Sequence, residues 1–221
     1  ELKENLILKG EVIENLKKVY DIERLAGKIA YGNANGRDMI SLKNSLLKLP
    51  ELKNVLKNVN SDLLKELYEN LDELKDVEEL IENSIVEDPP MSVKEGGIIK
   101  IGYNEEIDKL KTATTEGKNW ILQLEMDEKE KTGIKSLKVG FNKVFGYFIE
   151  VTKTYLNQVP DRYIRKQTLT NCERFITEEL KNLENQILGA EEKVINLEYL
   201  AFTEIREKIA SNIKRLQKSA N

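Results

Sequence analysis

The sequence predicts a mainly α-helical chain that also contains a small antiparallel β module. We expect a multi-helix core that leads into a long antiparallel helical stalk, with the β module at the tip of the stalk. Three observations support this prediction. Only four of the 221 residues are proline and 33% are charged, which is typical of helix-rich chains. Two long segments space their apolar residues alternately three and four apart, as paired helices do. Between them, residues 137–152 alternate with the period of two that strands show.

The first 90 residues predict a series of short helices. Asp21 and Ser61 each precede a helical pattern, and their side chains suit the N-cap position. Pro50 interrupts one pattern and Pro89-Pro90 end the series, because proline lacks the N–H group that a helix interior uses. Apolar residues recur at helical spacing in the ranges 12–20, 22–29, 37–49, 52–56, 61–67 and 71–85.

A long helix is predicted from about Asn104 to the segment 131–133, after a turn and a short extended segment at 96–101. The residues that step three and four apart along it are Ile107, Leu110, Thr114, Gly117, Ile121 and Leu124. Gly117 is either a weak point of this helix or the place where a partner helix approaches closely. Trp120 flanks the row, and we expect it to pack.

The β module is predicted to contain two hairpins. Residues 137–142 and 147–152 alternate around a glycine-containing turn, and 163–169 and 172–176 form a second pair around Thr170-Asn171. From residue 135 to 174 there are eight basic and three acidic side chains, about +5, whereas the whole chain is −4. The remainder therefore sums to about −9, so a basic module is carried by an acidic helical chain. Core packing is favoured over stacking on bases for Tyr147, Phe148 and Tyr163, because duplex bases expose no free faces.

Residues 177–220 predict one uninterrupted helix. Thr177 suits its N-cap, and two glutamates follow in the first turn, where they complement the helix dipole. Apolar residues step three and four apart as far as Ala201 and more widely afterwards. At ~1.5 Å per residue this helix would be roughly 65 Å long.

The residue types argue against catalysis by this chain. It contains no histidine, so the commonest general base and metal ligand is missing. Neither a phosphate-binding loop nor a dinucleotide fingerprint is present. Cys172 is the single cysteine, which suits a reducing compartment, and we interpret it as a half-buried strand residue. No apolar run approaches the ~18 residues of a membrane span. Because the chain starts with Glu1 and shows no signal-peptide pattern, we expect a segment of a longer protein.

Several runs of the sequence resemble the MutS family of DNA mismatch repair proteins. In the β module these are residues 138–151, KVGFNKVFGYFIEV, and residues 163–181, YIRKQTLTNCERFITEELK. Upstream, residues 20–25, YDIERL, and 96–104, GGIIKIGYN, resemble the core, or lever, of that family. The runs occur in the family's order and span nearly the whole chain. The run 167–175 is similar to the mismatch-repair branch rather than to the recombination-suppressing branch.

This resemblance implies a domain organisation and a function. Residues 1–130 would be the first part of the lever, 131–176 the β-rich clamp, and 177–221 the returning lever helix. In the family, two subunits form an ATP-driven mismatch sensor whose clamps hold double-stranded DNA by its backbone without reading sequence. The expected partners are therefore the duplex backbone, the rest of the MutS chain and a second MutS subunit, with no membrane.

The mismatch-reading domain and the ATPase would lie outside this chain. We therefore expect it to be no enzyme and to hold no cofactor, ATP and Mg²⁺ being needed only by the full-length protein. The resemblance also implies a cytoplasmic protein of bacterial type that works at the nucleoid.

Backbone binding requires cations and hydrogen-bond donors that face phosphates. Arg165 and Lys166 are the predicted cations, and Asn171 also matches the tip of the family's clamp. For any single lysine, a solvated face of the sheet explains the sequence as well as a contact does. The predicted DNA-binding residues are Arg165, Lys166, Asn171, Thr170, Thr168, Lys143 and Lys153.

Two functional hypotheses remain open on the sequence. In the first, the chain is a non-catalytic DNA-clamping and lever segment. In the second, it is a purely structural or allosteric lever, or a partner-docking module, and its basic tip makes no DNA contact. A salt-sensitive affinity for any duplex distinguishes them.

Overall fold

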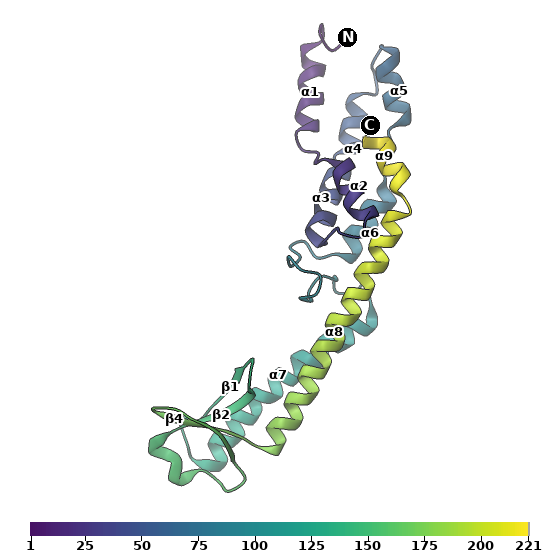
Figure 1. Cartoon of the computed structure of the whole chain (residues 1–221). Coiled ribbons are helices and arrows are strands. Elements are labelled where there is room, and N and C mark those ends of the chain that lie inside the picture. Colours follow the sequence, from purple (N-terminus) through teal and green to yellow (C-terminus); the bar gives the residue numbers. More distant parts are fainter. Residues whose placement is uncertain (221) are drawn as a thin grey trace. The chain divides into compact units, whose positions relative to one another are not determined.

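A computed structural model describes residues 1–220 of the chain (Figure 1). As predicted, the fold is mainly α-helical with one small antiparallel sheet. The chain divides into two compact units. Unit 1 comprises Glu1–Asn104 together with the chain from Ile195 onward, and unit 2 comprises Glu105–Val194. The division at 130 and 176 expected from the resemblance concerns function and stays a prediction.

Unit 1 is an assembly of short helices around the C-terminal part of a long one. The short helices are α1 (Leu6–Leu16), α2 (Ile22–Ala30), α3 (Gly36–Leu46), α4 (Leu49–Val55), α5 (Asp62–Asn70), α6 (Lys75–Ser84) and α9 (Ile213–Ala220). The long helix is α8 (Glu178–Ala210). Helix α2 packs against α9, and α3 packs against α6. The predicted extended segment is confirmed by an antiparallel bridge between Ile85 and Ile99.

Asp21 and Pro50 were both expected to mark a helix boundary, and each does so in a different way. Asp21 is the N-cap of α2, and its carboxylate accepts a hydrogen bond of 2.9 Å from the Arg24 N–H. Pro50, expected to interrupt a helix, lies instead in the first turn of α4. Proline is tolerated there because a first-turn N–H has no acceptor within the helix.

Ser61 and Leu74 show where local patterns are misleading. Ser61 occupies the N-cap position of α5, but its side chain makes no capping hydrogen bond. The pattern over 71–85 predicted a helix, yet Leu74 adopts a left-handed conformation with φ 53° and the helix starts at Lys75. Asp72 accepts the Leu74 N–H at 3.0 Å and also binds Arg215, so contacts with α9 hold this turn.

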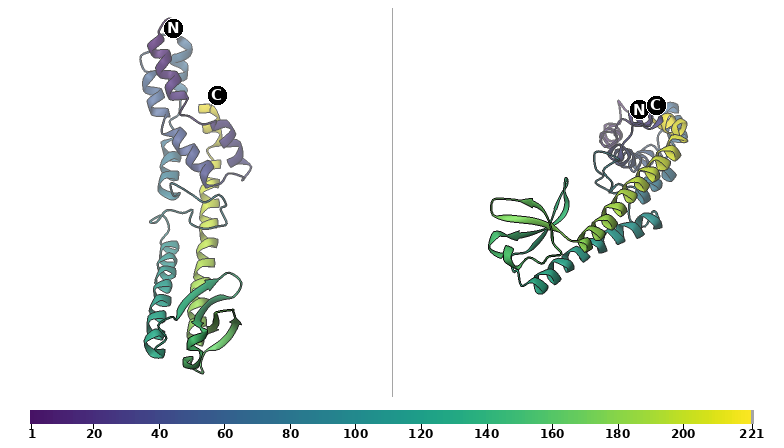
Figure 2. Two further views of the ribbon diagram at one scale, coloured as in Figure 1. Left: turned by 90° about the vertical axis from the view of Figure 1, so that its left-hand side faces the viewer. Right: turned by 60° about the horizontal axis from the view of Figure 1, so that its bottom comes forward.

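Unit 2 consists of two helices and a four-stranded sheet. Helix α7 is Glu105–Thr132, as predicted, and the first part of α8 is its antiparallel neighbour (Figures 1 and 2). The remaining elements are β1 (Lys138–Asn142), β2 (Gly146–Thr152), a 3₁₀ turn (Lys153–Gln158), β3 (Ile164–Thr168) and β4 (Cys172–Ile176). Both expected hairpins are present. Pairing of β2 with β4 joins them into one sheet with the order β1-β2-β4-β3.

Helices α7 and α8 approach closely at Gly117. A Cβ atom at this position would lie 2.6 Å from Cγ1 of Ile187, so the glycine admits the partner helix. An ion pair of 2.8 Å between Lys118 and Glu191 lies beside this contact. Trp120, which we expected to pack, is instead 52% exposed. The buried core of unit 2 is formed by Ile121, Leu124, Ile134, Leu137, Ile149, Val151, Tyr163, Phe175, Leu180 and Ile187.

The C-terminal helix begins as predicted but does not continue to Ala220. Thr177 caps it, its hydroxyl accepting the Leu180 N–H at 3.1 Å. Helix α8 ends at Ala210, and α9 starts after a break at Ser211-Asn212. Both of these side chains donate to the Lys208 carbonyl, and such local bonds compete with helix continuation. No helix of the described residues is long and apolar enough to cross a membrane.

Candidate nucleic-acid interface

One face of the sheet is covered by α7 and α8 and is apolar. Its strands contribute Ile149, Val151 and Phe175 to the core, and Tyr147 packs beside them. Tyr163 is 7% exposed. Phe148 lies on the opposite face, where the Arg174 guanidinium covers its ring at 4.0 Å from the centroid. These rings are occupied by packing, as predicted, and are not available to stack on bases.

The three arginines of the basic module are paired with carboxylates. Arg162 binds the buried Glu128 at 2.5 Å. Arg174 binds Glu150 at 3.0 Å and also donates to Gln167. Arg165 is more loosely held, with Glu173 at 3.7 Å and a side chain that is 65% exposed.

The five lysines of the module behave differently from its arginines. All five are exposed, and within the described residues none has a carboxylate oxygen within 4.0 Å. An exposed lysine without an intramolecular partner keeps its charge available to an external anion such as a phosphate. These side chains are Lys135, Lys138, Lys143, Lys153 and Lys166.

Strand β3 is an edge strand and carries the two cations that the sequence favoured. Its pairing with β4 shifts register between Arg165 and Gln167, so Lys166 is the extra residue of a bulge. A bulge bends an edge strand and redirects its side chains. Both Arg165 and Lys166 are exposed at this edge.

The turn between β3 and β4 places the predicted polar donors next to a lysine. Thr168, Thr170 and Asn171 are exposed there. The Lys153 N–H donates to the Asn171 carbonyl at 3.1 Å, which brings the end of β2 to this turn. We call the set Arg165, Lys166, Thr168, Thr170, Asn171 and Lys153 the basic edge.

Lys143 is separated from the basic edge. It lies in the β1–β2 turn, whereas Lys153 follows the opposite end of β2. At ~3.3 Å per residue the seven residues of β2 place the two ends roughly 20 Å apart. Lys138, which the sequence did not single out, lies at the same end as Lys153 because it pairs with Glu150. The hairpin pattern contained this signal, since antiparallel pairing places the start of one strand beside the end of the next.

Cys172 fits the structural role expected of it. It is half-buried at the start of β4. Burial, followed by the neighbouring Glu150 carboxylate, raises the pKa of its thiol. A thiol held in the protonated form is a weak nucleophile.

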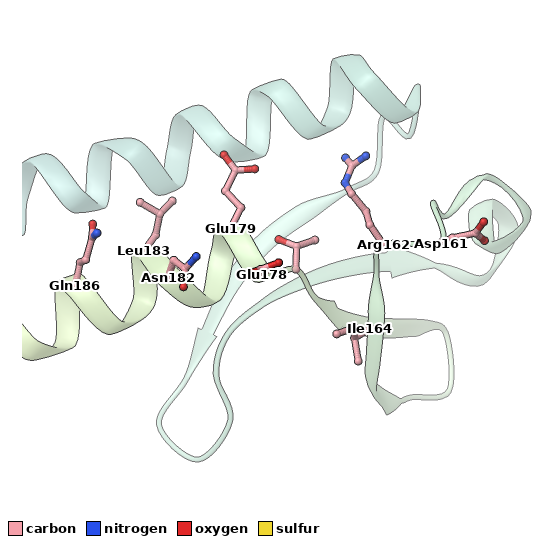
Figure 3. A pocket seen from close by; sticks show the side chains of 9 residues that line it. Asp161, Arg162, Ile164, Glu178, Glu179, Asn182, Leu183 and Gln186 are labelled. Atoms are coloured by element: carbon pink, nitrogen blue, oxygen red, sulfur yellow. The ribbon is translucent and has the colours of Figure 1, made fainter.

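A groove of about 800 Å³ lies between β3 and the start of α8 (Figure 3). Its lining includes the carboxylates Asp161, Glu178 and Glu179, and in Figure 3 Glu179 and Arg162 extend in the same direction. Because Arg162 is already paired with Glu128, the groove has an excess of negative charge. An anionic ligand such as a phosphate would be repelled here.

Comparison with known proteins identifies a family. The model of MutS family domain IV matches residues 102–193, nearly the same residues as unit 2. The chain is 56% identical over 219 residues to the DNA mismatch repair protein MutS of Alkaliphilus oremlandii, covering 99% of the chain and 25% of that protein. It is 61% identical over 210 residues to that of Caldanaerobacter subterraneus, covering 95% of the chain and 24% of that protein.

The chain therefore spans about a quarter of the length of the curated relatives that it matches. The matched region covers 99% of the chain and therefore includes every strand of the sheet. The chain belongs to the MutS family, of which it is a segment that includes domain IV.

Proposed function

We propose that this chain is the non-catalytic DNA-clamping and lever segment of a MutS-type mismatch repair protein. In this proposal the basic edge holds the duplex backbone and does not read its sequence. The observation that carries the proposal is the gathering of exposed cations and hydroxyl and amide donors along β3 and the β3–β4 turn.

The chemistry of the basic edge suits phosphates better than bases. Lysines without intramolecular partners attract phosphates with little geometric demand, and hydroxyl and amide donors add positional contacts. Reading of bases requires a helix or strand in a groove or rings free to stack, and Tyr147, Phe148 and Tyr163 are occupied by packing. Binding should therefore be similar for matched and mismatched duplexes.

The loose contact of Arg165 with Glu173 allows exchange of partners. The contact is long at 3.7 Å, and the Arg165 side chain is 65% exposed and can reach an external phosphate, whereas the Glu173 side chain is only 12% exposed. Thr168 donates to the same carboxylate at 3.5 Å, a bond at the limit of hydrogen-bond length. Arg165 and Thr168 therefore lie near the surface and make only long contacts with Glu173.

The second function is a lever that makes no DNA contact. The continuous 33-residue α8, which supplies residues to both units, favours a mechanical role in either case. The whole protein would contribute the remaining partners, namely the rest of the MutS chain and a second MutS subunit. ATP and Mg²⁺ would bind the full-length protein outside this segment, in the cytoplasm of a bacterium.

The expected affinity is modest. Three or four phosphate contacts give a slope of log K against log salt of roughly −3 and a dissociation constant of about 10⁻⁴–10⁻⁶ M. A second clamp in the full-length dimer would raise the effective concentration and tighten binding.

The experiment is fluorescence anisotropy with a labelled duplex of about 30 base pairs, at low and at physiological salt. We compare the native chain with the Arg165→Glu/Lys166→Glu variant, on matched and on mismatched duplex. The expected result is weak binding that falls steeply with salt, ignores the mismatch and is lost in the variant.

The matched control is Lys208→Glu/Lys214→Glu, which makes the same change of net charge on exposed residues of unit 1. It should bind almost as tightly as the native chain. An equal loss of duplex affinity in both variants would show a general effect of net charge and would contradict the assignment of the basic edge as the DNA-binding surface. No binding by the native chain at low salt would favour the lever without DNA contact.

A further inference from the structure

Two buried carboxylates and one half-buried carboxylate on α7 and α8 attach the sheet to the helices. Glu128 and Glu184 have side chains that are only 2% and 6% exposed, and Glu125 is 22% exposed. Burial of a carboxylate is costly unless hydrogen bonds compensate for the lost water. Each of the three accepts such a bond from the β module.

Glu125 and Glu184 bind backbone groups that no strand can reach. Strand β1 is an edge, and the Val139 N–H donates to Glu125 at 2.8 Å. Strand β2 extends beyond β4, whose pairing stops at Ile149, and the Tyr147 N–H donates to Glu184 at 2.9 Å. The helices thus complete the hydrogen bonding of the sheet at two places.

Glu128 makes the third attachment, just before β3. It accepts a hydrogen bond of 2.5 Å from the Tyr163 hydroxyl and pairs with Arg162 at the same distance. Burial, followed by the bond to Glu128, raises the pKa of Tyr163, so the phenol remains a donor. Burial of Glu125 acts to raise its pKa, but hydrogen bonds from Lys129 and Val139 outweigh burial and lower it.

Gly146, which precedes Tyr147, leaves room for the Glu184 carboxylate. Gly146 has φ +78°, and a Cβ atom there would lie 2.6 Å from the Glu184 Cδ. Any other residue would be strained in conformation and would displace a carboxylate that also binds Lys181 at 2.5 Å.

We propose that Glu125, Glu128 and Glu184 are positioning residues that fix the orientation of the sheet on the α7–α8 pair. Apolar packing alone is non-directional, whereas three charge-assisted bonds on β1, on β2 and before β3 define one orientation. The proposal rests on the proposed function in one respect, namely that the sheet so held presents the basic edge to DNA. None of the three carboxylates belongs to that edge.

The first measurement determines the orientation without DNA. In a Cys172→Ser background, spin labels at Thr170→Cys on the turn and Lys193→Cys on α8 report their distance distribution by double electron–electron resonance. We expect a narrow distribution for the native chain and one at least twice as broad for Glu125→Ala/Glu184→Ala. Glu125→Gln/Glu184→Gln should restore the narrow distribution, because an amide oxygen still accepts the two N–H bonds.

The second measurement is duplex affinity by anisotropy on the unlabelled variants. The alanine variant should bind about three- to tenfold more weakly, because only a fraction of its molecules present the basic edge correctly. The glutamine variant should recover most of this loss. Glu130→Ala/Glu192→Ala, on exposed positions of the same helices, is the control and should match the native chain in both measurements.

The two measurements separate this proposal from the proposed function. A distribution that stays narrow in the alanine variant overturns the positioning role, whatever the affinity. A broadened distance distribution with unchanged duplex affinity would show that the orientation of the sheet does not matter for DNA binding. If the native chain binds no duplex, the proposed function fails, and the distance distributions still decide whether the carboxylates orient the sheet.

Discussion

At the scale of single residues, two glycines of the long helices should respond in opposite ways to the same substitution. Gly117→Ala places a methyl group 2.6 Å from Ile187, and overpacking of this kind costs about 1–3 kcal/mol. Gly189→Ala meets nothing within 4 Å and should stabilise α8 by about 1 kcal/mol. Urea denaturation measures both, and equal stabilisation would show that the helices can separate at Gly117 without cost.

Within the basic module, the arginines are paired with carboxylates and the lysines are not, and the chemistry of the two side chains explains this difference. Arginine holds a carboxylate with a planar fork of donors and loses little entropy, so it suits fixed pairs such as Arg174 with Glu150. Lysine is a more flexible and more strongly hydrated charge. The charge count of the module could be read from the sequence, but which cations stay available depends on the carboxylates that folding brings near them.

At the scale of elements, the start of α8 should depend on its capping residue. Thr177→Ala removes a buried hydroxyl that accepts the Leu180 N–H and should lower the free energy of unfolding by about 1 kcal/mol. Ser61→Ala is the matched comparison, because Ser61 occupies the same position of α5 without a capping bond. Its effect should stay within about 0.5 kcal/mol, as chemical denaturation can show. A large loss in Ser61→Ala would contradict the assignment.

The ends of elements were harder to predict than the elements themselves. Periodicity located both long helices and both hairpins because apolar spacing reflects a buried face directly. It missed the break at Ser211-Asn212, where side chains compete for the backbone, and the turn at Leu74, which Arg215 stabilises through Asp72. The bonds to Lys208 are local and depend on polar side chains, and the contact between Arg215 and Asp72 joins residues distant in sequence, so neither leaves a periodic signal.

At the scale of the whole molecule, ion pairs that link elements of unit 1 should make its stability depend on pH. Lys100 and then Lys43 bind Glu82 and lower the pKa of its carboxyl to about 2. The pKa in the folded chain is below the unfolded value of about 4.3, so this stabilisation is present above that pH. It is lost as the pH falls from about 4.3 toward 2.

The test is Glu82→Gln, compared by urea denaturation between pH 7 and pH 2. Because Glu82 is 41% exposed, the variant should lose only about 1 kcal/mol at pH 7 and show a shallower decline on acidification. Glu79→Gln, at an exposed position of the same helix, should keep the native pH dependence. An unchanged slope in Glu82→Gln would assign the acid sensitivity to other carboxylates, such as Asp72 and Asp76, whose pKa values Arg215 lowers.

The sequence alone determined the helical class, the two hairpins, the basic character of the module and the family resemblance. These features depend on local spacing, composition and runs of residues, all of which are present before folding. Only the tertiary structure decided that β2 pairs with β4 and that Glu125, Glu128 and Glu184 bind the sheet. Those outcomes depend on distances between segments far apart in the chain, and a carboxylate on a helix looks the same in sequence whether it faces water or a strand.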